Sequence, residues 1–205
     1  MSPVLWVLIG ATVVTVGLLF ERRKRSRPLS LDEWALAHHR PVLREIPLSV
    51  LAEIEPVALL PFIVSIERFL PAPSEDGTAL FLCQCGPGHR PLHMLLAVAS
   101  LPSGVPHARV LPKTVRDVPA ELGFSEQDAT GLPAAYRIEA FSPLETALVH
   151  SVGLALPAAG TPIRIELRPG RLLVAIDETD GEAATALCRH AEAIRQALLA
   201  EAAPS

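Results

Sequence analysis

Two cysteines and two histidines lie close together in FLCQCGPGHRPLH, residues 81–93. Thiolates and imidazoles are preferred zinc ligands, and paired thiols can also carry redox chemistry. The spacing is Cys83-x-Cys85-x3-His89-x3-His93, whereas structural zinc sites commonly use cysteines separated by two residues. The stretch is a candidate metal or redox site only if these side chains share a face.

Apolar runs on both sides of the GPGHRP segment predict two antiparallel strands joined by a turn. Side chains alternate between the faces of a strand, so Cys83 and Cys85 share one face. The register that buries the apolar set pairs Cys83 with Met94, which leaves Gln84 opposite His93 on the other face. In that register the sheet itself separates His93 from both thiols.

Two interpretations of this hairpin follow. We expect the cysteines to be buried as small hydrophobic residues, with no metal, no cofactor and no catalytic residue in the chain. The alternative is a membrane-tethered metal or thiol redox protein that uses Cys83, Cys85 and His89, with His89 swinging from the turn towards the thiols.

Other arrangements that indicate catalysis are weaker. The sequence contains no G-x-S-x-G, H-E-x-x-H, G-x4-G-K-[ST] or G-x-G-x-x-G motif. Ser142, His150 and Asp177 could be combined as a triad, but a chain of 205 residues offers many such trios. The acidic run at residues 177–182 lacks EF-hand spacing and fits the start of a helix. We therefore expect a protein that is not an enzyme.

The charge distribution argues against nucleic acid as a partner. Residues 28–205 hold 13 of the 18 basic side chains and 21 of the 22 acidic ones, a net charge of −8. A surface of that sign repels phosphate backbones, and no basic stripe with interleaved aromatics is present. The other five basic side chains lie between residues 22 and 27.

An uncharged apolar stretch at residues 3–20 predicts a transmembrane helix. Its 18 residues would give a helix of about 27 Å, close to the ~30 Å hydrocarbon thickness of a bilayer. The basic run follows the stretch, and positive charge stays on the cytoplasmic side. We expect a single-pass bacterial membrane protein with its N-terminus outside and its C-terminal domain cytoplasmic.

The remaining chain predicts one α+β domain. Ser30 and Glu33 form a capping box for a short helix in which Trp34 and Leu36 should face the domain. Residues 163–176 are typical of a β-hairpin with a Pro-Gly turn. Thr179 and Glu182 suggest a second capping box, opening a helix that ends near residue 202.

We therefore divide the chain into a transmembrane helix (1–20), a basic juxtamembrane segment (21–29), a cytoplasmic domain (30–202) and a tail (203–205). The domain should contain a mainly antiparallel sheet packed by the C-terminal helix. Residues 42–72 are hard to interpret, with a short helix and a strand as the expectation. A helical turn is expected near residues 125–129.

Five short motifs carry a resemblance to a known family. They are Leu31-Asp-Glu-Trp34-Ala35, Cys85-Gly86-Pro-Gly88-His-Arg90, Val98-Ala-Ser-Leu101-Pro102, Tyr136-Arg-Ile-Glu-Ala and Leu172-Leu-Val. In this order they resemble an uncharacterised family of membrane-anchored actinobacterial proteins. The resemblance implies the fold and the anchor, and it implies no activity or catalytic residues. The chain departs from the family pattern in its single arginine at the hairpin tip and in its strand cysteines.

Taken together, these observations predict a membrane protein with a non-enzymatic binding or scaffolding domain. Its expected partners are the lipid bilayer, through residues 3–20, and a membrane or cytoplasmic protein.

Overall fold

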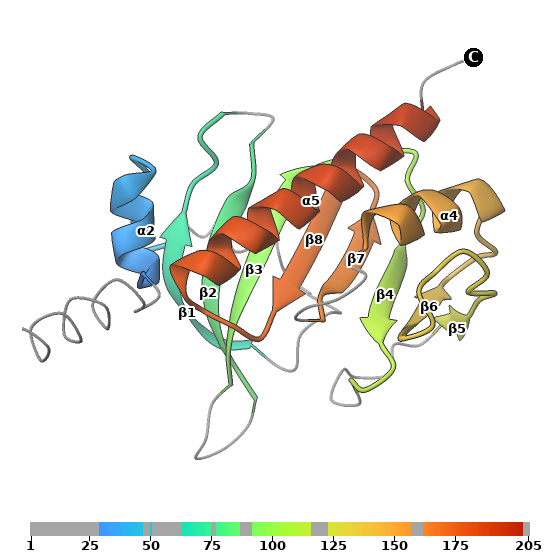
Figure 1. Cartoon of the computed structure of the whole chain (residues 1–205), viewed down its shortest axis with the longest axis horizontal. Coiled ribbons are helices and arrows are strands. Elements are labelled where there is room, and N and C mark those ends of the chain that lie inside the picture. Colours follow the sequence, from blue (N-terminus) through green and yellow to red (C-terminus); the bar gives the residue numbers. More distant parts are fainter. Residues whose placement is uncertain are drawn as a thin grey trace, which may run out of the picture.

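An antiparallel sheet of eight strands forms the centre of the computed structural model, which describes residues 29–46, 50, 63–74, 77–86, 92–115, 123–156 and 162–202 (Figure 1). The strands are β1 (Ile63–Leu70), β2 (Ala79–Cys85), β3 (Leu92–Ser100), β4 (Ala108–Pro112), β5 (Ser125–Glu126), β6 (Tyr136–Ala140), β7 (Arg164–Arg168) and β8 (Arg171–Ile176). The described helices are α2 (Leu31–Ala37), α4 (Thr146–Ala155) and α5 (Gly181–Ala202). The predicted α+β class with a C-terminal helix on an antiparallel sheet is confirmed.

The strands do not follow one another across the sheet in chain order. The order is β1-β2-β3-β8-β7-β4-β6-β5, so the β7–β8 hairpin lies between β3 and β4. The loop from β3 to β4 therefore passes the turn of that hairpin. The amide of Leu101 donates to the Gly170 carbonyl (2.9 Å), and the amide of Gly170 donates to the Pro102 carbonyl (3.2 Å).

Helix α5 lies across one face of the sheet, against β3 and β8, with α4 beside its C-terminal half (Figure 1). The stripe predicted from the sequence is buried in full: Leu187, Ala191, Ile194 and Leu198. Inward-facing residues of the strands, such as Leu95 and Val174, complete this core. A second apolar cluster, which includes Phe81 and Leu173, lies on the opposite face. Two apolar faces explain why β3 is buried along most of its length.

Helix α2 is docked onto the N-terminal end of α5. The predicted capping box of Ser30 and Glu33 is present, and Trp34 is buried with its indole Nε1 donating to Thr185 Oγ1 at 2.8 Å. The Gly181 amide donates to the Leu29 carbonyl at 2.7 Å. A Cβ at Gly181 would lie 2.9 Å from the Trp34 Cβ, so this close approach requires glycine.

Three local expectations were wrong. Leu36 is 78% exposed, because only the Trp34 side of α2 faces the domain. The residue that caps α5 is Asp180 instead of Thr179: its Oδ1 accepts from the Ala183 amide at 2.8 Å. Ser125 and Glu126 form strand β5 because they pair with β6, and this tertiary contact overrides the local helical pattern.

Several expectations fall on residues outside the described ranges. These are the transmembrane segment at residues 3–20, the basic run, most of residues 47–62 and the turn that carries His89. Among the described residues, no helix combines the length and the apolar character needed to cross a membrane.

Candidate functional site

The cysteine hairpin has the register that the sequence predicts. Cys83 lies opposite Met94, and Gln84 lies opposite His93. His93 instead approaches a glutamate of β1, with its Nε2 3.2 Å from Glu67 Oε1. The two thiols and His93 are therefore on different faces of the sheet. Among the described residues, no group of three histidine, cysteine, aspartate or glutamate side chains is placed to hold a metal.

Both hairpin thiols are fully buried in the second apolar cluster. Burial raises the pKa of the Cys83 thiol, and the neighbouring Cys85 raises it further. The pKa of Cys188, on α5, is also raised by burial, although the Arg40 guanidinium beside it acts in the opposite direction. Thiolates are the reactive and metal-binding form, so the full burial of Cys83 and Cys85 opposes both functions, whereas Cys188 is only partly buried.

The burial of the hairpin cysteines predicts slow reaction with a soluble maleimide or disulfide reagent. In the folded chain we expect modification at Cys188 alone, with Cys83 and Cys85 reacting only after denaturation. A Cys188→Ser variant should therefore show no fast thiol. Rapid labelling of Cys83 or Cys85 in that variant, or stoichiometric zinc by elemental analysis, would restore the metal or redox interpretation.

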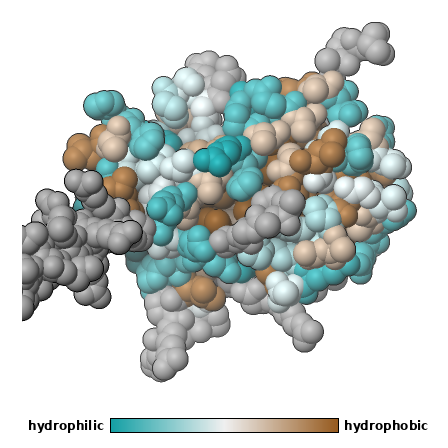
Figure 2. Space-filling view, viewed as in Figure 1, coloured by the Kyte–Doolittle hydropathy of each residue, from teal (hydrophilic) through white to brown (hydrophobic). Residues whose placement is uncertain are grey.

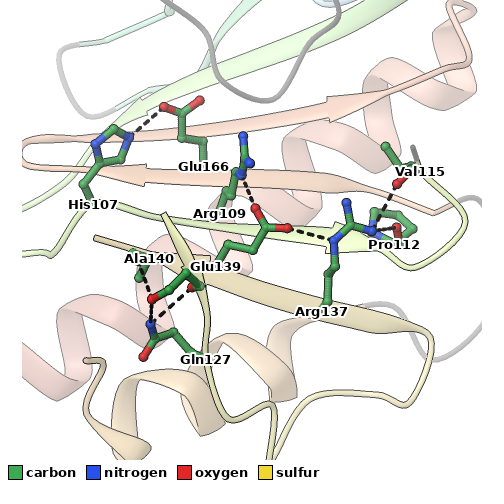
Figure 3. Close-up of polar contacts among 10 residues, drawn as sticks. His107, Arg109, Pro112, Val115, Gln127, Arg137, Glu139, Ala140 and Glu166 are labelled. Carbon is green, nitrogen blue, oxygen red and sulfur yellow. Dashed lines mark hydrogen bonds and ion pairs between the residues drawn. The ribbon is translucent and has the colours of Figure 1, made fainter. Parts of the chain in front are cut away.

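A row of buried and half-buried charged side chains lies on β6, β4 and β7, on the same sheet face as the two hairpin thiols (Figure 3). Arg109 on β4 is in register with Glu139 on β6 and with Glu166 on β7. The Arg109 Nε donates to Glu139 Oε2 at 2.6 Å, and the Arg137 Nε donates to Glu139 Oε1 at 2.9 Å. Immediately before β4, His107 Nε2 lies 3.0 Å from Glu166 Oε1.

The electrostatics of this row are those of a structural network. Burial of Glu139 acts to raise its pKa, but hydrogen bonds from Arg137 and Arg109 outweigh burial and hold the pKa below its usual range. Glu166 has no exposed surface and is also paired with Arg168. Arg164 and Glu166, which alternate with apolar residues along β7, are both buried. The ion pairs of this row link β6 to β4, and the register places Glu166 of β7 beside Arg109 of β4.

The other candidate groups are not assembled for catalysis. Within the described part of the chain, Ser142, His150 and Asp177 are not joined by hydrogen bonds, and Asp177 is instead paired with Arg164 (3.0 Å). In the acidic run at residues 177–182, Asp180 caps α5. This agrees with the interpretation of that run as the start of a helix.

A groove of about 380 Å³ lies between the β3–β4 loop, the start of α4 and the C-terminal end of α5. Its apolar walls are formed by Pro102, Val105, Pro106, Pro143, Leu148 and Leu198. On the α5 face, hydrophobic side chains reach the surface between α4 and the C-terminal half of α5 (Figure 2). The volume of the groove falls within the range of ~300–1,000 Å³ that is usual for ligand-binding clefts.

Two carboxylates border this groove. Glu145 precedes the first turn of α4, and its side chain makes no capping hydrogen bond. Glu201, in the last turn of α5, accepts a hydrogen bond from Ser151 Oγ of α4 at 2.9 Å. The last turn of α5 contains no basic residue, so the negative end of the helix dipole adds to these charges. Among the described residues, no lysine or arginine lines the groove.

The sequence interpretation missed this groove. The residues that line it come from three segments that are distant in the chain. The local signal was the density of prolines in residues 102–106 and at residue 143. That signal indicates rigid loops, and it does not indicate that the loops meet.

Comparisons with known proteins identify a shared fold. No family model and no curated protein matches the chain. The crystal structure of the mycobacterial trehalose monomycolate transport factor A, TtfA, is similar with a TM-score of 0.50, covering 80% of this chain and 90% of that chain. The sequence identity is 11%, so the likeness concerns the fold alone.

Proposed function

We propose that this chain is a single-pass membrane protein whose domain, residues 30–202, binds or holds a partner at the cytoplasmic face without catalysing a reaction. The observation that supports the proposal is the attachment of Leu29, where the predicted basic segment ends, to helix α5. Leu29 is the last residue of the basic segment, and its carbonyl is bound by the Gly181 amide of α5. Trp34 then secures α2 to Thr185.

This attachment limits how far the domain can move from the bilayer. Residues 21–29 span at most about 32 Å when fully extended. The N-terminal end of α5 therefore stays close to the predicted membrane anchor. The C-terminal end of α5, with the groove, lies about 30 Å further along the helix, because 20 residues separate Gly181 from Glu201. Anchoring and groove binding thus use opposite ends of α5.

Two further observations support a role in binding. The thiols and the buried charged row described above stabilise the fold, while the groove is open. A solved structure with a similar fold is that of a transport factor named for trehalose monomycolate. On that basis we infer an accessory role for this chain, without assigning it a transported molecule.

The proposal predicts a discrete cross-linked partner in intact cells. A photo-reactive residue placed at exposed Leu154 of α4, in the full chain, should give one adduct in the membrane fraction. The same position in a chain without residues 1–20 should lose most of that adduct, because anchoring raises the local concentration of chain and partner. The measurement is the mass-shifted band and its identification by mass spectrometry.

A second chain carries the photo-reactive residue at exposed Leu36 of α2, at the opposite end of the domain. Its adducts are compared with those formed from Leu154. The side of the membrane is checked with an impermeant maleimide in a Cys188→Ser background. A cysteine at Ser205 should react only after the cells are permeabilised. Labelling of that cysteine in intact cells, or no adduct from either photo-reactive position, would contradict the proposal.

A further inference from the structure

We propose that the groove between α4, α5 and the β3–β4 loop binds a short protein segment that combines apolar residues with lysine or arginine. The inference deepens the proposed function, on which it rests, because it assigns the partner's chemistry and the surface that receives it. It is carried by the apolar walls of the groove, by its rigid loop and by the two carboxylates at its border.

The walls select for apolar side chains. Proline rings at residues 102, 106 and 143 present carbon surface and carry no amide hydrogen, so these positions offer no backbone donor to a ligand. Leu148 and Leu198 close the groove from the two helices. Burying one leucine side chain in such a groove contributes roughly 1.5–3 kcal/mol. Apolar contact therefore supplies the main attraction for an occupant.

The groove exists before any ligand binds. The β3–β4 loop is held by the β7–β8 turn through the hydrogen bonds between Leu101, Pro102 and Gly170. The Val105 amide also donates to the Pro102 carbonyl at 3.3 Å, which closes the loop on itself. Proline fixes the backbone angle φ, so little conformational entropy remains to be lost on binding. A preformed wall favours affinity for a short segment.

The charges at the border of the groove determine which charge the occupant must carry. Glu145 and Glu201 lie on different helices at the border of the groove, and the negative end of the α5 dipole is close to Glu201. A cation placed between them would be attracted by all three. An anionic lipid headgroup or an acidic segment would be repelled, which excludes the inner-leaflet surface as the occupant. A segment with apolar side chains and a basic residue satisfies both the walls and the border.

The test uses the full chain in lipid nanodiscs, with a display library of short peptides as the probe. We expect enriched peptides to contain apolar residues and at least one lysine or arginine. For a synthetic peptide of the enriched sequence, Glu145→Gln with Glu201→Gln should raise Kd about tenfold, and higher ionic strength should weaken binding. Leu148→Arg, which places a bulky, positively charged side chain on the groove wall, should abolish binding.

The matched control removes two carboxylates elsewhere, with Glu126→Gln and Glu182→Gln, and should leave Kd unchanged. Thermal unfolding of every variant confirms folding, and the Glu201→Gln side chain keeps an amide oxygen that can accept from Ser151.

Three results would overturn the inference: no enriched peptide, enriched peptides that lack basic residues, or binding that survives Leu148→Arg. Binding of a simple alkylamine with the same affinity would also overturn it, in favour of a small-molecule site. A partner cross-linked from α2 despite a failed groove test would leave the proposed function standing.

Discussion

Replacement of Glu166 by alanine is expected to destabilise the domain by about 3–5 kcal/mol. The carboxylate has no exposed surface, and it pairs with the His107 imidazole and the Arg168 guanidinium. Arg109 of β4 lies opposite it in register. Removing the carboxylate leaves the mostly buried Arg168 guanidinium without its partner, and a charge largely out of contact with water is costly when it is unpaired.

The measurement is urea unfolding of the chain beginning at Leu29, compared with the same change at Glu126. Glu126 is exposed on the edge strand β5, so Glu126→Ala should stay within about 0.5 kcal/mol of the parent. Glu166→Gln keeps the shape and one acceptor, so its loss should fall between the two. Equal stabilities for Glu166→Ala and Glu126→Ala would show that the buried row does not hold the strands together.

Gly153→Ala is the second substitution with a large expected effect. Helix propensity alone predicts that alanine at this position, near the C-terminal end of α4, stabilises the helix by up to about 1 kcal/mol. The surroundings reverse that sign, because a Cβ at this position would lie 2.0 Å from the carbonyl oxygen of Gly131 and 2.9 Å from its carbonyl carbon. These are backbone atoms, so no side-chain rotation relieves the clash. Helix α4 would have to move away from the loop, at a cost of about 3 kcal/mol or more.

Gly104→Ala is the matched control, because a Cβ there meets nothing within 4 Å. It should leave the free energy of unfolding almost unchanged. The same urea titration measures the stability of both variants. Binding of the enriched peptide to the groove provides a second comparison. Leu148 lies in α4 and Glu145 directly precedes it, so displacement of the helix should also weaken that binding. A Gly153→Ala protein more stable than the parent would contradict the close approach of α4 to the loop.

The cysteine hairpin could be predicted from the sequence because its determinants are local. Side chains alternate between the two faces along both neighbouring segments, so few registers bury all the apolar residues. The pairing of Cys83 with Met94 is one that does. The start of α2 was equally accessible, because a capping box lies within four consecutive residues. For α5 the same pattern misled by one residue, since Asp180 and Thr179 are both good caps.

The order of the strands was not accessible in this way. The insertion of the β7–β8 hairpin between β3 and β4 joins segments that are about 70 residues apart in the chain. No local pattern distinguishes that order from its alternatives, because each strand presents a similar apolar face. The groove depends on the same long-range arrangement, so its carboxylates, Glu145 and Glu201, had no signal that linked them.

The sequence by itself determined the α+β class, the two hairpins, the start of α2 and the prediction of an apolar anchor followed by basic residues. Each of these depends on the periodicity or the charge of neighbouring residues. Only the tertiary structure decided that Glu166 is buried and that Gly153 must remain glycine. It also decided that two proline-bearing segments and the C-terminal end of α5 enclose a groove with carboxylates at its border. The physical reason is that burial and steric contact at these positions come from elements distant in the chain, whose packing is settled by the whole core.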